Sequence, residues 1–207
     1  IIPAYNEEER IEKVVDTYGP YFEKQFSDNF EFLIIVNNSS DKTVEVVEKL
    51  CKKHKYLRWA NFPYYTGKGG AIVEGFKIAK GDIIGFVDSD LAVVPDQYMK
   101  LFSKIEEYDI VMASRWVKGA KILNREDIQV VIAGRVYNLI VRFLFGVNVR
   151  DTQCGGKIFR RGLIQKIIPH LHVKGFGIDL DILYKSKKVG AKIYELPITW
   201  SHIEEGS

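Results

Sequence analysis

Strand-like and helix-like segments alternate through the first 113 residues, and this alternation limits the fold more than any other feature. Continuous apolar runs such as residues 30–36 are typical of buried strands, whereas apolar residues at every third or fourth position, as in residues 41–53, indicate helices. The alternation predicts an α/β fold with a mainly parallel, Rossmann-like sheet and helices on both faces. We expect strands at residues 1–2, 30–36, 56–60, 82–87, 109–113, 154–159 and 192–196, and helices at residues 8–18, 41–53, 70–79, 95–106, 130–147 and 176–189.

The alternation of strands and helices ends after residue 114, because residues 114–126 contain few apolar residues and predict a long loop. The next segment, residues 130–147, is strongly apolar, but Arg135, Asn138 and Arg142 lie on one stripe of the predicted helix. Two arginines and an asparagine make it a poor membrane span. Two interpretations stay open: an amphipathic helix at a membrane surface, or a core helix with a polar edge.

Composition narrows the class of protein. A chain of 207 residues, 46% hydrophobic and 28% charged, fits one globular domain. A net charge of +3 without a Lys/Arg run argues against nucleic-acid binding and is compatible with weak attraction to an anionic membrane. Cys51 and Cys154 lack metal-ligand spacing, which indicates reduced thiols and a cytoplasmic setting. No signal peptide or clean spanning segment is present; we expect residues to be missing before Ile1, and an anchor beyond Ser207 is compatible with this sequence.

Two carboxylates, Asp88 and Asp90, follow the apolar run that ends at Val87. In extended geometry residues i and i+2 point the same way, so both side chains are expected to aim at one point past the strand. Like charges held that close repel unless a cation lies between them, and oxygen ligands suit Mg²⁺ or Mn²⁺, which commonly share their shell with phosphates. The alternative is a solvated turn. Ligands of open α/β sheets bind at the carboxyl ends of strands, which favours the metal hypothesis.

Two further motifs precede predicted helices. At residues 3–8, Pro3 is expected to end strand pairing, and Asn6 and Glu7 lie where a loop enters a helix, so the alternative is an ordinary N-cap. At residues 67–71, glycines let backbone N–H groups approach an anion at a helix N-terminus, and Lys68 adds a positive charge. A plain glycine-rich turn is the alternative there.

The later strands carry more polar residues. Arg115 follows the strand at 109–113, so it returns to the same sheet edge as Asp88, where its fork can bind phosphate oxygens. Residues 150–156 gather charged and small side chains before another strand. Asp179 and Asp181 lie two apart on a predicted helix, so only one of them can point into a site.

Taken in order, these motifs resemble the family-2 glycosyltransferases with the GT-A fold, and most of all the polyprenyl-phosphate hexose synthases of the dolichyl-phosphate glucose and mannose type. The likeness covers nearly the whole chain. It runs through residues 3–7, 67–71, 87–90, 114–115, 150–155 and 196–200. Arg-Asp-Thr-Gln-Cys-Gly at residues 150–155 favours the glucosyltransferase branch.

The resemblance implies a role for each matching residue. The nucleotide pocket would be lined by Pro3, Ala4, Tyr5 and Glu7, with Lys68 beside the base and ribose. Asp88 and Asp90 would bind the diphosphate, directly or through the metal. Arg115 would face the acceptor phosphate, and Asp151 and Gln153 would border the sugar and acceptor. The single catalytic domain, residues 1–207, would divide into a nucleotide-sugar half (1–113) and an acceptor half (114–207).

Two departures from the family pattern affect this assignment. The family usually has Asp-Asp-Gly-Ser after the second strand, where this chain has Val36-Asn37-Asn38-Ser39. Asn37 can bond a base edge but has lost the charge, which leaves the choice between UDP and GDP open. Ala92 stands where some mannose synthases have a metal-binding glutamine, so phosphates and water would complete the metal shell.

The resemblance implies one in-line displacement with inversion at the anomeric carbon. The attacking group would be a lipid monophosphate at the cytoplasmic face of a membrane. Such a phosphate is already ionised, so it needs positioning by Arg115, with Arg135 or Arg142, more than it needs deprotonation. A polysaccharide or protein acceptor would instead require a base such as Asp151 or Asp179. A non-catalytic nucleotide-sugar-binding module is the alternative of another class.

Overall fold

The computed structural model describes residues 1–64, 66–123 and 128–201. Tyr65, residues 124–126 of the predicted loop and residues 202–207 therefore lie outside the described part. The strands are β1 Ile2–Ala4, β2 Phe32–Asn37, β3 Leu57–Phe62, β4 Ile83–Phe86, β5 Ile110–Ser114, β6 Lys121–Ile122, β7 Lys157–Arg160, β8 Ile193–Pro197 and β9 Thr199–Trp200. The helices are α1 Ile11–Phe26, α2 Thr43–Lys53, α3 Gly67–Ile78, α4 Pro95–Met99, α5 Ile128–Phe145, α6 Arg161–Ile167 and α7 Ile178–Lys188, with 3₁₀ turns at Lys100–Lys104 and Ile168–His170.

Two groups of strands form the central sheet. β1, β2 and β3 pair in parallel, and β4, β7, β5 and β8 are adjacent in that order. β7 alone runs antiparallel to its neighbours β4 and β5, while β5 and β8 are parallel. The prediction of a mainly parallel sheet is thus confirmed. Since β1, β2, β4, β5 and β8 share one direction, their carboxyl ends meet at one edge.

The two groups join where β1 lies beside β4. The Ile1 nitrogen donates to the Gly85 carbonyl at 2.7 Å, and the Val87 N–H donates to the Ile1 carbonyl at 3.1 Å. Two residues later the same side of β1 presents Pro3, which has no N–H to give to β4. Pro3 nevertheless stays in register with Ile35 of β2. The prediction that Pro3 ends strand pairing is therefore wrong for β2.

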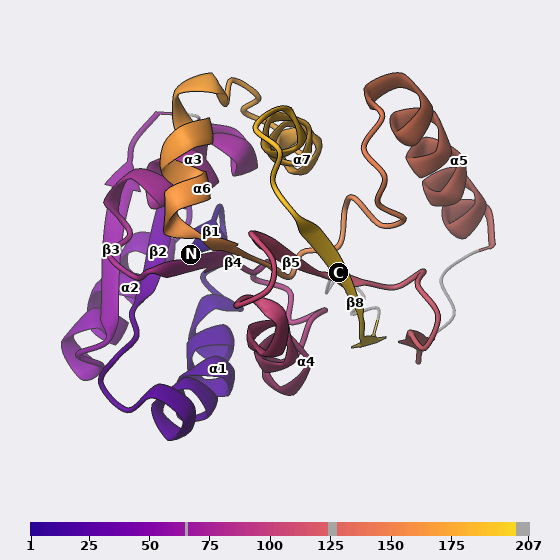
Figure 1. The fold of residues 1–207 in the computed structure, drawn as a ribbon. Helices are drawn as coiled ribbons and strands as arrows, with labels where there is room; N and C mark the ends of the chain where they lie inside the picture. Colours follow the sequence, from indigo (N-terminus) through magenta and orange to yellow (C-terminus); the bar gives the residue numbers. More distant parts are fainter. Residues whose placement is uncertain (65, 124–127, 202–207) are drawn as a thin grey trace.

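Helices cover both faces of the sheet, as predicted. Phe32, Ile34 and Val36 of β2 belong to the core formed with α1, α2 and α4, whereas Leu33 and Ile35 point to the opposite face, against α3. This alternation is the period-2 side-chain pattern of a strand buried on both sides. Figure 1 shows α3, α6 and α7 on one side of the sheet and α1 and α4 on the other.

Helix α1 is longer than the pattern predicts. It continues through Pro20 to Phe26, eight residues beyond the expected end at Tyr18. A proline inside a helix removes one backbone hydrogen bond. The aromatic cluster on this face offsets that loss, because Phe22 lies with its ring centroid 5.0 Å from Phe32 and 5.5 Å from Phe26.

Helix α5 stands beside the layered body of the molecule (Figure 1). Its side chains at Leu139 and Phe143 are 65% and 87% exposed, whereas Asn138 is 4% exposed. A core helix would show the opposite arrangement, so that interpretation is wrong. Among the residues that the structure describes, no helix combines the length and apolarity needed to cross a membrane.

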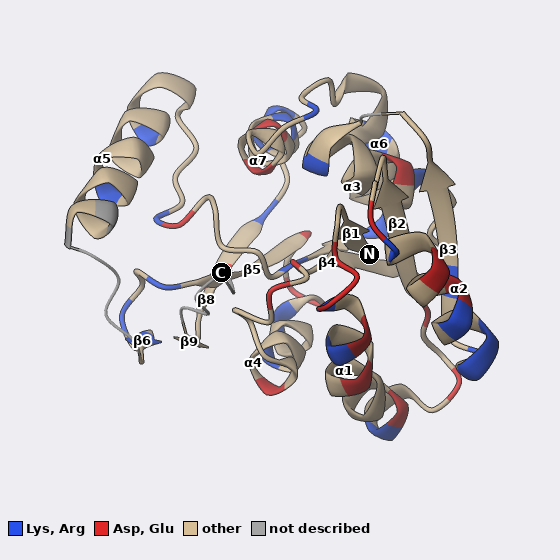
Figure 2. Ribbon diagram, turned by 180° about the vertical axis from the view of Figure 1, so that it is seen from behind, with Lys and Arg blue, Asp and Glu red and all other residues tan. Residues whose placement is uncertain are grey.

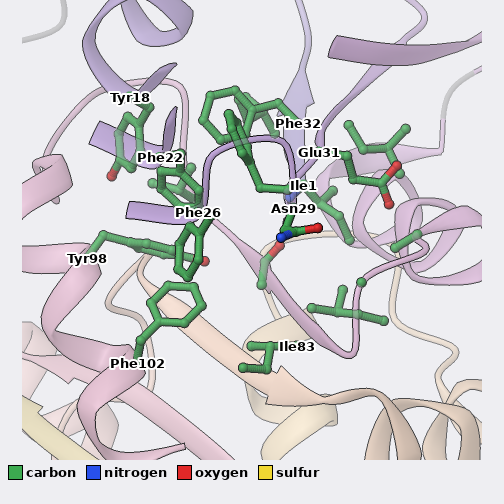
Figure 3. A pocket seen from close by; sticks show the side chains of 18 of the residues that line it. Ile1, Tyr18, Phe22, Phe26, Asn29, Glu31, Phe32, Ile83, Tyr98 and Phe102 are labelled. Atoms are coloured by element: carbon green, nitrogen blue, oxygen red, sulfur yellow. Dashed lines mark hydrogen bonds between the residues drawn. The ribbon is translucent and has the colours of Figure 1, made fainter. Parts of the chain in front are cut away.

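An apolar cavity of about 280 Å³ lies beside Ile1. Tyr18, Phe22, Phe26 and Phe102 surround it (Figure 3). Its remaining lining includes the first residues of β2 and β4. The cavity is therefore at the amino ends of the strands, away from the edge where the polar motifs gather.

Gly85 in β4 provides a test of how tightly the sheet packs on α4. A Cβ at this position would lie 2.7 Å from the Lys157 carbonyl and would also clash with the Tyr98 hydroxyl. We predict that Gly85→Ala lowers the free energy of unfolding by about 1–3 kcal/mol, the usual cost of overpacking. Urea denaturation measures it. Gly162→Ala in α6 is the matched control, because a Cβ there meets nothing within 4 Å; equal effects of the two changes would contradict the prediction.

Candidate functional site

Two adjoining cavities open at the carboxyl edge of the sheet. The larger, about 450 Å³, lies between the ends of β1, β2 and β4 and the start of α3. The smaller, about 110 Å³, lies between the end of β4, Arg115 and the loop before β7. Asp88 and Asp90 line both cavities, so the carboxylate pair forms their shared wall.

The structure brings most of the predicted site residues into these two cavities. The larger one is lined by Pro3, Ala4, Tyr5, Glu7, Asn37, Lys68 and Asp88, together with Asp90. Arg115 and Gln153 line the smaller one. Asp151 lines neither cavity, because it is fully buried behind Arg115.

Asp88 is paired with Lys68, which comes from the first turn of α3. The Lys68 Nζ lies 2.7 Å from Asp88 Oδ1. Burial opposes the charged form of Lys68, but Asp88 and Asp179 outweigh it, so the pKa of Lys68 is raised above its ordinary value. The ammonium also lies 5.7 Å from the centre of the exposed Phe176 ring. Lys68 is therefore a fixed positive charge on the floor of the larger cavity.

Asp90 has a different environment. β4 ends at Phe86 and residues 89–90 form a turn, so the predicted extended geometry is wrong, although both carboxylates reach the same cavities. Asp90 accepts the Ala92 N–H at 2.9 Å and has no ion pair within the described residues. Burial, with a further contribution from Asp88, raises the pKa of Asp90 above its usual range.

Glu7 lies on the β1 side of the larger cavity. Its carboxylate accepts hydrogen bonds from Ser89 Oγ at 2.7 Å and from Arg10 Nε at 2.7 Å. Burial raises the pKa of Glu7, and the bonds from Ser89 and Arg10 work against that rise. Because Ser89 lies between Asp88 and Asp90, Glu7 anchors the turn that carries both carboxylates.

Asn37 has its side-chain oxygen engaged by the loop before α3. Asn37 Oδ1 accepts the Thr66 N–H and the Thr66 hydroxyl, both at 2.8 Å. Both residues are buried. Asn37 therefore fixes the entry to α3, and with it Lys68. Asn38 has a φ of 53°, a conformation that Asn tolerates and that explains a glycine at this place in the family pattern.

Arg115 is held from three sides. Its N–H, Nε and Nη2 donate to the Asp151 carboxylate at 2.9, 2.8 and 2.9 Å. The guanidinium lies 5.4 Å from the ring centre of Trp116 and 5.2 Å from that of Trp200. Such packing leaves the planar fork little rotational freedom, so a well-defined positive group faces the smaller cavity.

Asp179 and Asp181 diverge, as predicted for neighbours two apart on a helix. Asp179 is buried and lies 2.6 Å from the Nζ of the fully buried Lys157, which also donates to the Cys154 carbonyl at 2.5 Å. Asp181 instead accepts the His172 N–H at 3.0 Å. Neither carboxylate lines either of the two cavities at this edge. Asp179 thus ties α7 to the first residue of β7, and Lys157 in turn bonds the loop that precedes that strand.

The donor set at the shared wall suits a hard divalent cation. Within the described residues no group of three or more His, Cys, Asp or Glu side chains gathers to hold a metal. Asp88 and Asp90 alone would be the protein ligands. Such a pair fits Mg²⁺ or Mn²⁺, which accept oxygen ligands and fill remaining positions with water and phosphate oxygens.

Sequence reasoning missed several residues of the site. Arg10 and Phe176 line the larger cavity, yet both lie in segments whose pattern indicated only a helix. Trp200 lines the smaller cavity and belongs to the motif at residues 196–200, but no role was predicted for it. Glycines flank Phe176 on both sides, and an exposed aromatic between two glycines was the one available signal.

Comparison with known proteins gives a consistent result. The family model described as glycosyl transferase family 2 matches residues 1–168. The chain is 32% identical, over 98% of its length, to a dolichyl-phosphate beta-glucosyltransferase of Trichomonas vaginalis, and covers 63% of that protein. It is 29% identical to the dolichyl-phosphate beta-glucosyltransferase of Saccharomyces cerevisiae, over 99% of the chain and 66% of the relative. The chain thus spans slightly less than two thirds of these relatives.

Solved structures of similar fold include glucosyl-3-phosphoglycerate synthase from Mycobacterium tuberculosis. Its structure in complex with uridine diphosphate matches this chain with a TM-score of 0.69 and 20% sequence identity. The match covers 100% of this chain and 70% of the other. Its structure in complex with Mn²⁺ and UDP-glucose matches with a TM-score of 0.70 and 19% sequence identity, and the match covers 99% of this chain and 70% of the other. The likeness establishes the GT-A fold.

The buried pair of Lys157 and Asp179 leads to a stability prediction. Replacing Lys157 with Met leaves Asp179 as an uncompensated buried charge, so we expect the free energy of unfolding to fall by about 3–5 kcal/mol. The double change Lys157→Met with Asp179→Leu should recover most of that loss. The control is Lys77→Met, whose partner Glu74 lies at the surface, with an expected effect of about 0–1 kcal/mol. Equal losses for Lys157→Met and Lys77→Met in urea denaturation would contradict the expectation.

Proposed function

The chain belongs to glycosyl transferase family 2, and on this premise we propose that it moves a hexose from a nucleotide diphosphate sugar to a polyprenyl phosphate, with inversion at the anomeric carbon. The supporting observation is that two cavities share the wall made by Asp88 and Asp90. A donor in the larger cavity and an acceptor in the smaller one would meet at this wall. Residues 1–113 would supply most of the donor side, and residues 114–207 would supply Arg115 and Gln153 of the acceptor side.

In this proposal the larger cavity takes the nucleotide sugar. Pro3, Ala4, Tyr5 and Asn37 form its nucleotide end, and Lys68 supplies positive charge toward the diphosphate. UDP and GDP are both retained as donors. The relatives named above are glucosyltransferases, which supports glucose over mannose as the sugar.

Metal dependence is part of the proposal. Asp88 and Asp90 would hold Mg²⁺ or Mn²⁺, and the bound ion would neutralise charge that develops on the leaving diphosphate. Two observations support this. Asp90 is a partly buried carboxylate without an ion pair among the described residues, and Mn²⁺ accompanies UDP-glucose in a solved structure of the same fold. Lys68 and Arg10 add fixed positive charge on the donor side.

The smaller cavity suits a phosphate headgroup. Its volume of about 110 Å³ is well below the roughly 300–1,000 Å³ of pockets that enclose whole small-molecule ligands. Arg115 lines this cavity, and Asp151 orients its guanidinium by accepting hydrogen bonds from Nε and Nη2. A phosphate monoester with a second pKa of about 6 is mostly ionised at neutral pH, so the reaction needs no general base.

The alternative acceptor, a polysaccharide or protein hydroxyl, would need such a base. Asp151 and Asp179 were the candidates, but each carboxylate is buried against a cation and lines neither cavity. This supports the phosphate acceptor. The other alternative, a non-catalytic nucleotide-sugar-binding module, would not need a second cavity with an oriented arginine.

Membrane attachment through α5 completes the proposal. Figure 2 shows two blue segments and no red on this helix, and its 18 residues include Arg135 and Arg142 but no acidic residue. Its exposed Ile132, Leu139 and Phe143 suit insertion at a lipid interface. The polyprenyl chain of the acceptor would then enter from the cytoplasmic face of the same membrane.

Transfer itself can be tested with radiolabelled UDP-glucose or GDP-mannose, polyprenyl phosphate and Mn²⁺. We expect label in the organic phase with the wild-type chain, and a loss of at least about a hundredfold for Asp88→Asn or Asp90→Asn without loss of folding. Asp82→Asn, at the exposed amino end of the same strand, is the control.

Other outcomes identify the alternatives. Label confined to water-soluble polymer or protein would favour the hydroxyl acceptor. Nucleotide-sugar binding without transfer would favour the binding module, and full activity of the Asp88→Asn variant would remove the metal site.

Membrane attachment is tested by flotation with anionic phosphatidylserine vesicles. Replacing Leu139 and Phe143 with Ser removes exposed apolar surface, so we expect vesicle partitioning to fall by about tenfold or more. Ile78→Ser, at an exposed apolar position of α3, is the control and should leave partitioning unchanged. Undiminished flotation of the double variant would show that α5 does not face the lipid.

A further inference from the structure

Helix α5 buries one polar side chain among those the structure describes, that of Asn138. On the flanking positions of the helix, Leu139 is 65% exposed and Tyr137 is 39% exposed. A buried amide on a helix that is otherwise largely exposed requires partners, because an unpaired polar group in that position is costly.

The side chain of Asn138 makes three hydrogen bonds, and the donor or acceptor character of each partner fixes how the amide is oriented. Its Oδ1 accepts the Thr152 N–H at 2.9 Å and the Thr152 hydroxyl at 2.8 Å. Its Nδ2 donates to the Gly134 carbonyl, one turn earlier, at 2.9 Å. A backbone N–H requires the oxygen and a carbonyl requires the amide nitrogen, so the orientation of the side chain is unambiguous. Thr152 is fully buried.

Thr152 belongs to a loop whose backbone is held by side chains. The N–H groups of Arg150 and Asp151 donate to Glu195 of β8 at 2.8 and 3.0 Å. Three successive backbone donors therefore end on two side chains, Glu195 and Asn138. No strand ladder fixes this loop, so its conformation depends on those acceptors.

The same loop orients the acceptor-side arginine. Asp151, next to Thr152, receives three hydrogen bonds from Arg115. Gln153, on the other side of Thr152, lines the smaller cavity and lies 3.5 Å from the Tyr137 hydroxyl of α5. A shift of Thr152 would therefore displace both neighbours.

We propose that Asn138 is a positioning residue for the acceptor: by holding Thr152 it keeps Asp151, and through it Arg115, in register with Asp88 and Asp90. The proposal rests on the proposed function, because it takes Arg115 to bind the acceptor phosphate. It also gives α5 a second task. The helix that faces the lipid is the same element that fixes the phosphate site, so the headgroup of a membrane-embedded acceptor meets an arginine already in place.

Asn37 makes the same contact on the donor side. Its oxygen accepts the N–H and hydroxyl of Thr66 as that of Asn138 does with Thr152. Each cavity is thus bordered by a loop that an asparagine fixes through a threonine. The repetition supports a positioning role, since general packing would not reproduce the same three-atom arrangement at both loops.

Kinetics with a short, water-soluble polyprenyl phosphate test the proposal without involving membrane binding. Asn138→Leu leaves two buried donors unpaired, and we expect the KM for the acceptor to rise about tenfold or more. The dissociation constant for the nucleotide sugar, measured by calorimetry, should change by less than about twofold. Asn148→Leu, the same change at an exposed position, is the matched control.

Thr152 provides gentler variants in case Asn138→Leu folds poorly. Thr152→Val removes the hydroxyl and keeps the N–H, so a several-fold rise in acceptor KM is expected. Thr152→Ser keeps both groups and should behave as wild type. A rise with Thr152→Ser equal to that with Thr152→Val would assign the effect to packing and overturn the proposal, as would equal losses of donor and acceptor affinity in Asn138→Leu.

Hydrogen exchange separates this inference from the proposed function. The amides of Asp151 and Thr152 should exchange at least about tenfold faster in Asn138→Leu than in Asn148→Leu, whatever the acceptor is. If wild-type protein transfers no sugar to polyprenyl phosphate, the proposed function fails. The exchange measurement still tests whether Asn138 holds the loop through Thr152. Unchanged amide exchange at Asp151 and Thr152 would overturn the inference that Asn138 holds this loop.

Discussion

Charge pairing governs how the loops of this site come together. Four buried or half-buried carboxylates each lie against a cation, and each pair joins separate parts of the chain or fixes a turn. The pairs are Glu7 with Arg10, Asp88 with Lys68, Asp151 with Arg115 and Asp179 with Lys157. Burying any of these charges alone would cost more than the loop could recover. Asp90, which lines both cavities, has no ion pair among the described residues, and burial together with the nearby charge of Asp88 raises its pKa.

Local patterns predicted most of the sheet because burial on both faces leaves a clear signal. The apolar runs of β2 and β5 have that signal, and both strands lie close to the expected ranges. Direction is not encoded locally, so nothing in residues 157–160 indicated that β7 runs antiparallel. The continuation of α1 past Pro20 depends on aromatic contacts with β2 and α4, which no window of sequence contains. Helix α6 has seven residues and follows β7 without a loop, so its pattern is too short to separate from the strand.

The membership of the site was more predictable than its internal contacts. Residues after strands gather because parallel strands end at one edge, and this rule is independent of side-chain detail. The partners of those side chains come from far along the chain: Thr66 lies 29 residues from Asn37, and Asp151 lies 36 residues from Arg115. No spacing rule links such pairs. The family resemblance implied that Asp151 borders the sugar and the acceptor. In the structure Asp151 is buried behind Arg115 and holds its guanidinium.

The loop that Asn138 fixes also touches the carboxylate wall directly. A Cβ at Gly155 would lie 2.9 Å from the Cγ of Asp88, so only a glycine lets the loop approach this closely. Residues 150–155 consequently contact Arg115 at one end and Asp88 at the other. In the proposed reaction, an incoming phosphate and a departing diphosphate would need a fixed separation for in-line displacement. One short loop contacts both Arg115 and Asp88, and side chains of α5 and β8 hold that loop, so the folded chain would set this separation before either substrate binds.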